Sequence, residues 1–184
     1  MDRELVVRAR DGDHDAFARL AAGSIGRLNA IARLILTDHS RAEDAVQESL
    51  VDAWRNLRAL RDPERFDAWL TRILVRSCQD MRRLDRRRRL LEMPLVDAAP
   101  QIDDLQASVA TTDQLERGLR RLTIEQRTVL VLSYYLDLSL ADAAAALGIP
   151  IGTMKSRLSR ATEALRASVD ATERQPAYPA ERLA

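Results

Sequence analysis

Apolar side chains recur every three to four positions through the first ninety residues, which is the spacing of a helix that buries one face. The pattern predicts four helices, at about residues 2–11, 13–36, 40–57 and 66–89. Gly12 ends the first helix, and the capping-box sequence that begins at Ser40 opens the third. A turn at Asp62-Pro63 interrupts the pattern before the fourth. We therefore expect an N-terminal helical domain over residues 1–92.

The pattern stops between residues 93 and 111, where proline and aspartate accumulate and no basic residue occurs. Ordering the backbone costs about 1–2 kcal/mol per residue, and the few apolar side chains here offset little of it. Helical spacing returns at residue 113 and continues to about 169. These changes predict a flexible acidic linker over 93–111, a C-terminal domain over 112–170 and a disordered tail over 171–184. Because nothing alternates as a strand would, the expected fold class is all-α, with two small helical domains.

Two short helices of the C-terminal domain have the arrangement of a helix-turn-helix. Ser139 caps the first of them, and Gly148 ends it in the left-handed conformation. The last helix buries its apolar positions 154, 158, 161 and 165. Its opposite side is polar and basic: Gly152, Lys155, Ser156, Arg157, Ser159, Arg160 and Glu163. Such a surface fits the major groove of DNA, and the alternative is a solvated helix face on which Arg160 pairs with Glu163.

Charge is unevenly distributed along the chain, although the formal net charge is only +1. Residues 51–92 contain twelve basic and seven acidic side chains, whereas residues 93–116 contain five acidic and no basic ones. A concentrated basic segment indicates a polyanionic partner. The fourth helix carries a polar stripe at helical spacing: Arg72, Arg76, Gln79, Arg83 and Arg86. Arginines on one face with Phe66 and Trp69 nearby suit a phosphate backbone or unstacked bases.

The third helix presents a different outward face, which consists of Asp44, Gln47, Glu48, Val51 and Arg55. Carboxylates, an amide and a valine at this spacing could dock a basic partner helix. A solvated helix face is the alternative interpretation of this stripe. Trp54 is interpreted as a core residue.

Several classes of function are excluded by what the chain lacks. Cys78 is the one cysteine, so the chain has no internal disulfide framework and no multi-cysteine metal site. His14 and His39 are the only histidines, and no cofactor or metal is expected. No apolar run is long enough to span a membrane, and the N-terminus lacks the apolar stretch of a signal peptide. We expect a soluble cytoplasmic protein with no membrane insertion of its own.

Three segments together resemble the bacterial sigma factors of the small extracytoplasmic-function (ECF) type. Residues 42–48 (AEDAVQE) are similar to the polymerase-docking motif of that family, and residues 66–73 (FDAWLTRI) to its promoter-melting helix. Residues 138–158 are similar to the helix-turn-helix that reads the −35 promoter element. The order and the separation of the segments agree as well, and the resemblance covers about residues 3–168.

The resemblance implies an alternative sigma factor, not an enzyme, that binds core RNA polymerase and directs promoter-specific initiation. It implies that the coiled coil of the largest polymerase subunit contacts Asp44, Gln47, Glu48 and Val51. It implies that the melted −10 strand contacts the loop 58–65 and the arginines Arg72, Arg76 and Arg83, and that the −35 duplex contacts Lys155, Ser156, Arg157, Ser159 and Arg160. Many relatives have asparagine where Arg76 stands, so this arginine is expected to bind phosphate. The linker would thread through the polymerase, and an anti-sigma factor is an expected further partner.

Other classes of function compete with this interpretation. A one-component transcription regulator would use only the helix-turn-helix, and would leave the stripes of the third and fourth helices unexplained. A phosphodiester-cleaving enzyme would need carboxylates clustered with a metal, whereas Asp103 and Asp104 lie in the predicted linker. A structural helical adaptor would have no affinity for DNA. Run-off transcription with core polymerase separates a sigma factor from a regulator.

Overall fold

The computed structural model describes the backbone of residues 2–91 and 117–173, and the side chains of residues 2–81 and 117–171. Most of these residues are helical, and none of the described residues belongs to a strand. The predicted linker 93–111 and the tail from residue 174 onward lie outside the described residues.

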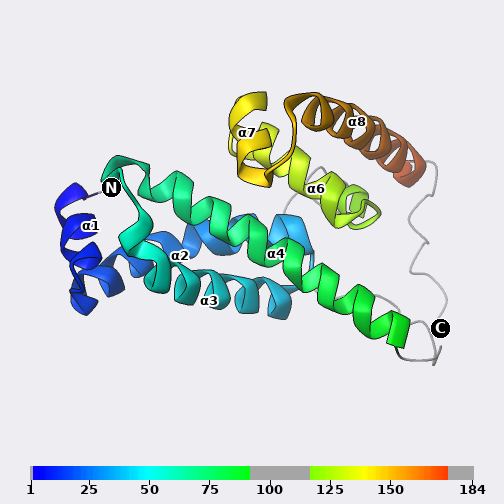
Figure 1. Cartoon of the computed structure of the whole chain (residues 1–184). Helices are drawn as coiled ribbons and strands as arrows, with labels where there is room; N and C mark the ends of the chain where they lie inside the picture. The colour runs from blue at the N-terminus through cyan, green and yellow to red at the C-terminus, as the bar shows by residue number, and fades with distance from the viewer. Residues whose placement is uncertain (1, 92–116, 174–184) are drawn as a thin grey trace, which may run out of the picture.

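The N-terminal half contains four helices: α1 (Arg3–Arg10), α2 (His14–Leu36), α3 (His39–Asn56) and α4 (Phe66–Leu91). Helices α2, α3 and α4 pack against one another, and α1 packs against α2 (Figure 1). Their shared core contains Leu28 and Ile31 from α2, Val46 from α3, and Leu70 and Leu74 from α4, all of them buried. These are positions that the helical spacing selects, so the predicted core of this half is confirmed.

Helix α3 begins two residues earlier than the capping-box pattern predicts. Its N-cap is Asp38, whose carboxylate accepts a hydrogen bond from the Arg41 amide at 2.9 Å. Ser40 lies in the first turn, so the prediction that Ser40 caps the helix is wrong. As the N-cap, the aspartate satisfies an amide of the first turn and adds a negative charge that the helix dipole favours. The Glu43 carboxylate lies 3.0 Å from Nε2 of His39 and so does not complete a capping box with Ser40.

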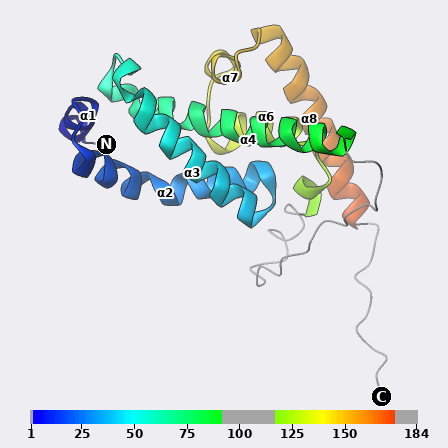
Figure 2. The ribbon, with the colours of Figure 1, turned by 60° about the horizontal axis from the view of Figure 1, so that its bottom comes forward.

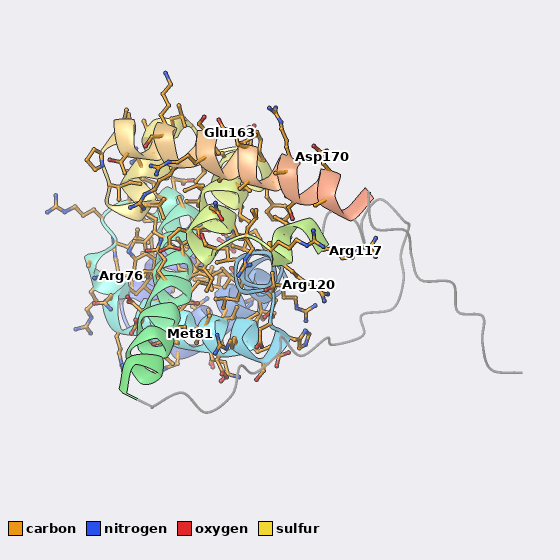
Figure 3. All side chains as sticks on the ribbon, turned by 90° about the vertical axis from the view of Figure 1, so that its right-hand side faces the viewer. Arg76, Met81, Arg117, Arg120, Glu163 and Asp170 are labelled. Carbon is orange, nitrogen blue, oxygen red and sulfur yellow. The ribbon has the colours of Figure 1, made fainter. Side chains whose placement is uncertain are left out.

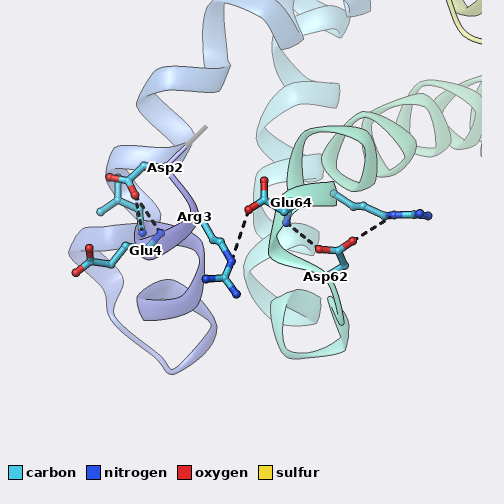
Figure 4. A network of polar contacts seen from close by, with 7 residues as sticks. Asp2, Arg3, Glu4, Asp62 and Glu64 are labelled. Atoms are coloured by element: carbon cyan, nitrogen blue, oxygen red, sulfur yellow. Dashed lines mark hydrogen bonds and ion pairs between the residues drawn. The ribbon is translucent and has the colours of Figure 1, made fainter.

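Two 3-10 turns, η1 (Leu57–Ala59) and η2 (Pro63–Arg65), occupy the predicted loop between α3 and α4. The Asp62 carboxylate accepts a hydrogen bond from the Glu64 amide at 3.1 Å and lies 3.3 Å from Nε of Arg65. Glu64 in turn lies 3.5 Å from Nε of Arg3 on α1 (Figure 4). The loop is thus tied both to itself and to the first helix, which fixes the approach of the chain to α4.

The C-terminal half contains helical residues 117–120, α6 (Ile124–Leu130), the π-helical turn η3 (Val131–Tyr135), α7 (Leu140–Leu147) and α8 (Ile151–Glu173). The predicted capping box of α6 is confirmed. The Thr123 amide donates to Oε1 of Gln126 at 2.9 Å, and the Gln126 amide donates to Oγ1 of Thr123 at 3.3 Å. Helix α8 extends to Glu173, beyond the predicted end near Val169, so the first residues of the predicted tail are helical.

The predicted helix-turn-helix of α7 and α8 is confirmed. The Ser139 hydroxyl caps α7 by accepting a hydrogen bond from the Asp142 amide at 3.1 Å. Gly148 ends the helix at φ +63°, a conformation that glycine adopts without a steric penalty. Ala144 and Met154 are buried where the two helices meet, as the small residue before the turn predicts.

The two halves contact each other, with α6 and α7 packed on the α4 side of the N-terminal half (Figure 2). Helix α6 also packs against α2. Arg127 of α6 lies at this contact and is only 5% exposed. Its Nε donates to the carbonyl of Ile35 at the end of α2 at 2.5 Å, and its Nη1 donates to the carbonyls of Leu122 at 2.7 Å and Leu119 at 3.2 Å. Burial lowers the pKa of Arg127 to about 10, so the guanidinium stays charged at neutral pH. One buried side chain thus joins the last turn of α2 to the segment that precedes α6.

Candidate nucleic-acid and polymerase interfaces

The outer side of α8 is the first candidate surface. Met154 and Ala161 are fully buried and fix the rotation of the helix about its axis. The opposite side is therefore exposed: Gly152, Lys155, Ser156, Ser159, Arg160 and Glu163. Arg157, on the flank, is partly buried. Of the predicted duplex-binding residues, four are fully on the surface and one is at its margin.

Hydrogen bonds on this surface leave its positive charge available. Nε of Arg160 donates to the carbonyl of Ser156 at 3.2 Å, and the Glu163 carboxylate accepts from the Ser159 hydroxyl at 3.3 Å. The Arg160–Glu163 ion pair of an ordinary solvated helix is thus replaced by two other hydrogen bonds. A guanidinium that uses one donor on a carbonyl still has donors for a base edge or a phosphate.

A cleft of about 760 Å³ lies between the start of α4 and the C-terminal half. Four arginines line it: Arg27 from α2, Arg61 and Arg65 from the loop, and Arg72 from α4. Trp69, partly buried, lies on the same wall, and Leu136, Leu138, Asp142 and Ala146 line the opposite one. Of the predicted α4 stripe, Arg72 therefore lies at this cleft beside an aromatic ring, and the other three arginines come from α2 and the loop.

The other predicted arginines of α4 lie farther along the helix. Arg76 is exposed but does not line the cleft. In Figure 3 it lies along α4, whereas Glu163 lies along α8 in the other half of the molecule. The side chain of Arg83 lies outside the described residues, as does that of Arg86. The structure thus brings Arg72 together with the loop and keeps Arg76 on the open face of α4.

The outward face of α3 forms the third candidate surface. Asp44, Gln47, Glu48 and Val51 are all exposed, and Val51 is 48% accessible. Ala45, Val46 and Ser49 are buried on the other side of the helix. An accessible valine within an acidic stripe offers an apolar contact surrounded by charge, which is typical of a docking face. Trp54 is partly buried, with its ring centroid 4.4 Å from that of His14 and 5.0 Å from that of Phe17.

Catalytic and metal chemistry has little support in the described part of the chain. Among those residues, no three His, Cys, Asp or Glu side chains are grouped to hold a metal ion. Cys78 is buried, and burial raises the pKa of its thiol to about 12, so the thiol stays protonated at neutral pH. No described helix is long and apolar enough to cross a membrane.

Two sequence families match this chain, Sigma-70 region 2 over residues 24–89 and Sigma-70 region 4 over residues 112–165. The ECF RNA polymerase sigma factor SigM of Mycobacterium tuberculosis is 36% identical over 160 residues, which make up 87% of this chain and 80% of the relative. SigW of Bacillus subtilis, also an ECF sigma factor, is 28% identical and covers 90% of this chain and 95% of its own. The chain belongs to the ECF RNA polymerase sigma factors. It is an alternative sigma factor that directs transcription initiation.

Solved sigma factor structures are similar to this one. RpoE of Bartonella quintana, solved with the anti-sigma factor NepR, is 28% identical and superposes with a TM-score of 0.70 over 84% of this chain and 96% of its own. CnrH, solved with the cytosolic domain of CnrY, is 29% identical and has a TM-score of 0.60 over 92% of this chain and 97% of its own. The all-α fold with two domains is thereby confirmed, while the domain boundaries at 92 and 112 stay predictions.

The matched regions coincide with the candidate surfaces of the sigma factor. Region 2 contains the α3 face and the described arginines of α4, and region 4 contains the α8 surface. A regulator that used only the helix-turn-helix would have no need of region 2. The match to both regions favours the sigma factor over that alternative.

Sequence reasoning missed Arg27 and did not single out Arg61. Arg27 lies on α2, forty residues before the part of α4 that it contacts, so no spacing within one helix reveals it. Its signal in the sequence is its position directly before the buried Leu28, which places an arginine at the edge of an apolar face.

Proposed function

We propose that this sigma factor recognises its promoter with two cationic surfaces, one on each half. Arg72, Arg76 and Arg83 of α4 bind the −10 strand, and the α8 surface binds the −35 duplex. The observation that carries the proposal is the exposure of Lys155, Ser156 and Arg160 on a helix-turn-helix whose other side is buried. The two surfaces belong to different halves, as separate recognition of two promoter elements requires.

Within the α8 surface, position determines the role of each residue. Ser156 and Arg160 lie near the centre of the exposed side and reach base edges, because they face the floor of the groove. Lys155 and Arg157 lie toward its margins and bind phosphate. The partial burial of Arg157 agrees with a marginal position.

Core polymerase binds the α3 face, through Asp44, Gln47, Glu48 and Val51. All four are exposed on one side of a helix whose other side is packed in the core. The negative charge of this face suits a basic helical partner.

The protein works without catalytic chemistry of its own, in the cytoplasm where polymerase acts. An anti-sigma factor is a further proposed partner, because the similar RpoE was solved with the anti-sigma factor NepR.

The docking role is tested with Asp44→Arg and Gln47→Ala in pull-down with core polymerase and in run-off transcription. We expect Asp44→Arg to weaken core binding at least about tenfold, which corresponds to about 1.4 kcal/mol, because it places a cation against a basic partner. Gln47→Ala removes one hydrogen-bonding group and has a smaller effect. Circular dichroism of both variants should match that of the wild type.

Asp170→Arg is the matched control, because Asp170 is also an exposed aspartate on a helix but lies on α8 (Figure 3). It should bind core polymerase like the wild type. Full binding by Asp44→Arg and Gln47→Ala would contradict the docking role. A wild-type chain that directs no transcription with core polymerase would contradict the proposed function as a whole.

A further inference from the structure

Arg27 connects α2 to the first two turns of α4 at the cleft. Its Nη2 donates to the Asp67 carboxylate at 2.6 Å, and its Nη1 donates to the Thr71 hydroxyl at 2.9 Å. The same hydroxyl donates to the Asp67 carbonyl at 2.7 Å. One guanidinium therefore holds two residues that are one turn apart on α4, and Thr71 is itself 6% exposed.

Asp67 is an unfavourable neighbour for a polyanion. It lines the same cleft as Arg61, Arg65, Trp69 and Arg72. Its side chain remains about half exposed, at 46%, so a nucleic acid strand in the cleft would meet its charge. Two like charges a few ångströms apart repel strongly where water is displaced. Arg27 places a positive charge directly on this carboxylate.

The Arg27 guanidinium also has donors to spare. A guanidinium carries five N–H groups, and the two bonds to Asp67 and Thr71 use one on each terminal nitrogen. The side chain is 37% exposed and lines the cleft. It therefore presents N–H groups and charge toward the space that Arg72 and Trp69 border.

We infer that Arg27 is a positioning residue of the −10 site, which neutralises Asp67 and orients the start of α4 for the melted strand. The inference rests on the proposed function, because it requires the strand to enter this cleft. It adds a residue of α2 to a site that the loop and α4 otherwise form. If Arg27 acts by neutralising Asp67, removing Arg27 should lower transcription mainly because the Asp67 carboxylate is then left unpaired.

The test uses the full chain with core polymerase in run-off transcription from a duplex promoter that the wild type recognises. We expect Arg27→Ala to lower the yield of transcript about tenfold, whereas Asp67→Asn stays near the wild type. The double variant Arg27→Ala/Asp67→Asn should recover most of the loss, because residue 67 then carries no charge that Arg27 would have to neutralise. A residue that only held α4 in place would give no such recovery, since asparagine does not restore the missing bridge.

Three controls separate the outcomes. Arg19→Ala removes an exposed arginine of α2 that does not line the cleft, and should leave transcription unchanged. Thr71→Val removes the second hydrogen bond but keeps the charge pair, and should have a smaller effect than Arg27→Ala. Core binding by pull-down should be the same for all variants.

The inference is overturned if Arg27→Ala transcribes like the wild type, or if the double variant is as defective as Arg27→Ala. It is also overturned if Arg27→Ala and the double variant both lose core binding, or if circular dichroism shows that both are unfolded. A wild type that directs no transcription overturns the proposed function, and this inference with it.

Discussion

The basic side chains at the cleft and those on α8 differ in how many of them form ion pairs with carboxylates. Two of the four arginines that line the cleft are paired with carboxylates: Arg27 lies 2.6 Å from that of Asp67, and Arg65 lies 3.3 Å from that of Asp62. On α8, by contrast, none of Lys155, Arg157 and Arg160 forms an ion pair with a carboxylate of the described residues.

This difference suggests that paired arginines position a bound strand, whereas unpaired cations contribute to the affinity for DNA. A paired arginine has a fixed direction and a reduced net charge, so it organises a site more than it attracts a polyanion. An unpaired lysine or arginine retains its full charge and releases counterions when it meets phosphate. We therefore expect the N-terminal half to contribute geometry for a melted strand, and α8 to contribute salt-dependent affinity for duplex DNA.

The largest expected effect concerns Arg127, the buried arginine whose partners are carbonyls. Arg127→Met removes three hydrogen bonds from a charged donor and leaves the carbonyls of Ile35, Leu119 and Leu122 without it. We expect the free energy of unfolding to fall by about 3 kcal/mol, measured by circular dichroism in urea. Arg157→Met on α8 is the control and should change stability far less. Equal stability of the two variants would show that the hydrogen bonds from Arg127 to the three carbonyls do not stabilise the fold.

The next effect concerns base recognition by α8. Arg160→Ala should cost about 1–3 kcal/mol of binding to a −35 duplex and relax the preference at one position. Fluorescence anisotropy on a panel of −35 variants, at two or more salt concentrations, measures both quantities. An unchanged ranking of the panel would assign Arg160 to phosphate instead of to a base.

A smaller and more uniform effect is expected at Lys155. Lys155→Ala should weaken binding to all duplexes of the same panel to a similar degree. It should also reduce the slope of binding against the logarithm of salt concentration by about one unit, because one phosphate contact is lost. If Lys155→Ala weakened binding to only one duplex, Lys155 would contact a base. The proposed difference between central base-reading residues and marginal phosphate-binding residues of α8 would then be wrong.

The smallest effect is expected for an exposed ion pair of the N-terminal half. Arg3 and Glu64 lie 3.5 Å apart with side chains that are each 69% exposed. Exposed pairs contribute little, so Glu64→Gln should move the melting temperature by no more than about 1 °C. A larger loss would mean that ion pairs around the loop stabilise the fold as well as arranging it.

The sequence predicts those features that depend on neighbours along one helix. The buried faces of α2 and α8, the capping box at Thr123 and the stop at Gly148 all follow from local spacing and turn chemistry. The sequence places the start of α3 two residues late, because Asp38 and Ser40 are both residue types that cap helices well and the structure uses Asp38.

Contacts between helices escape the same reasoning. The bridge from Arg27 to Asp67 spans forty residues, and the bond from Arg127 to Ile35 spans ninety-two. Both depend on how one helix is rotated against another, which spacing within either helix does not encode. For this reason the sequence identifies the exposed surface of α8 but not the residue of α2 that completes the cleft.

The placement of the two tryptophans gives the protein an internal optical reporter. Trp54 and Trp69 are the only tryptophans of the chain, and both belong to the N-terminal half. Trp54 is shielded by His14 and Phe17, whereas Trp69 lines the cleft that Leu136 and Leu138 of the other half help to close. Any partner that draws the halves apart will transfer one indole toward water and leave the second in place. The emission maximum of the unlabelled protein will then shift to longer wavelength, with Trp69→Phe as the variant in which the shift disappears.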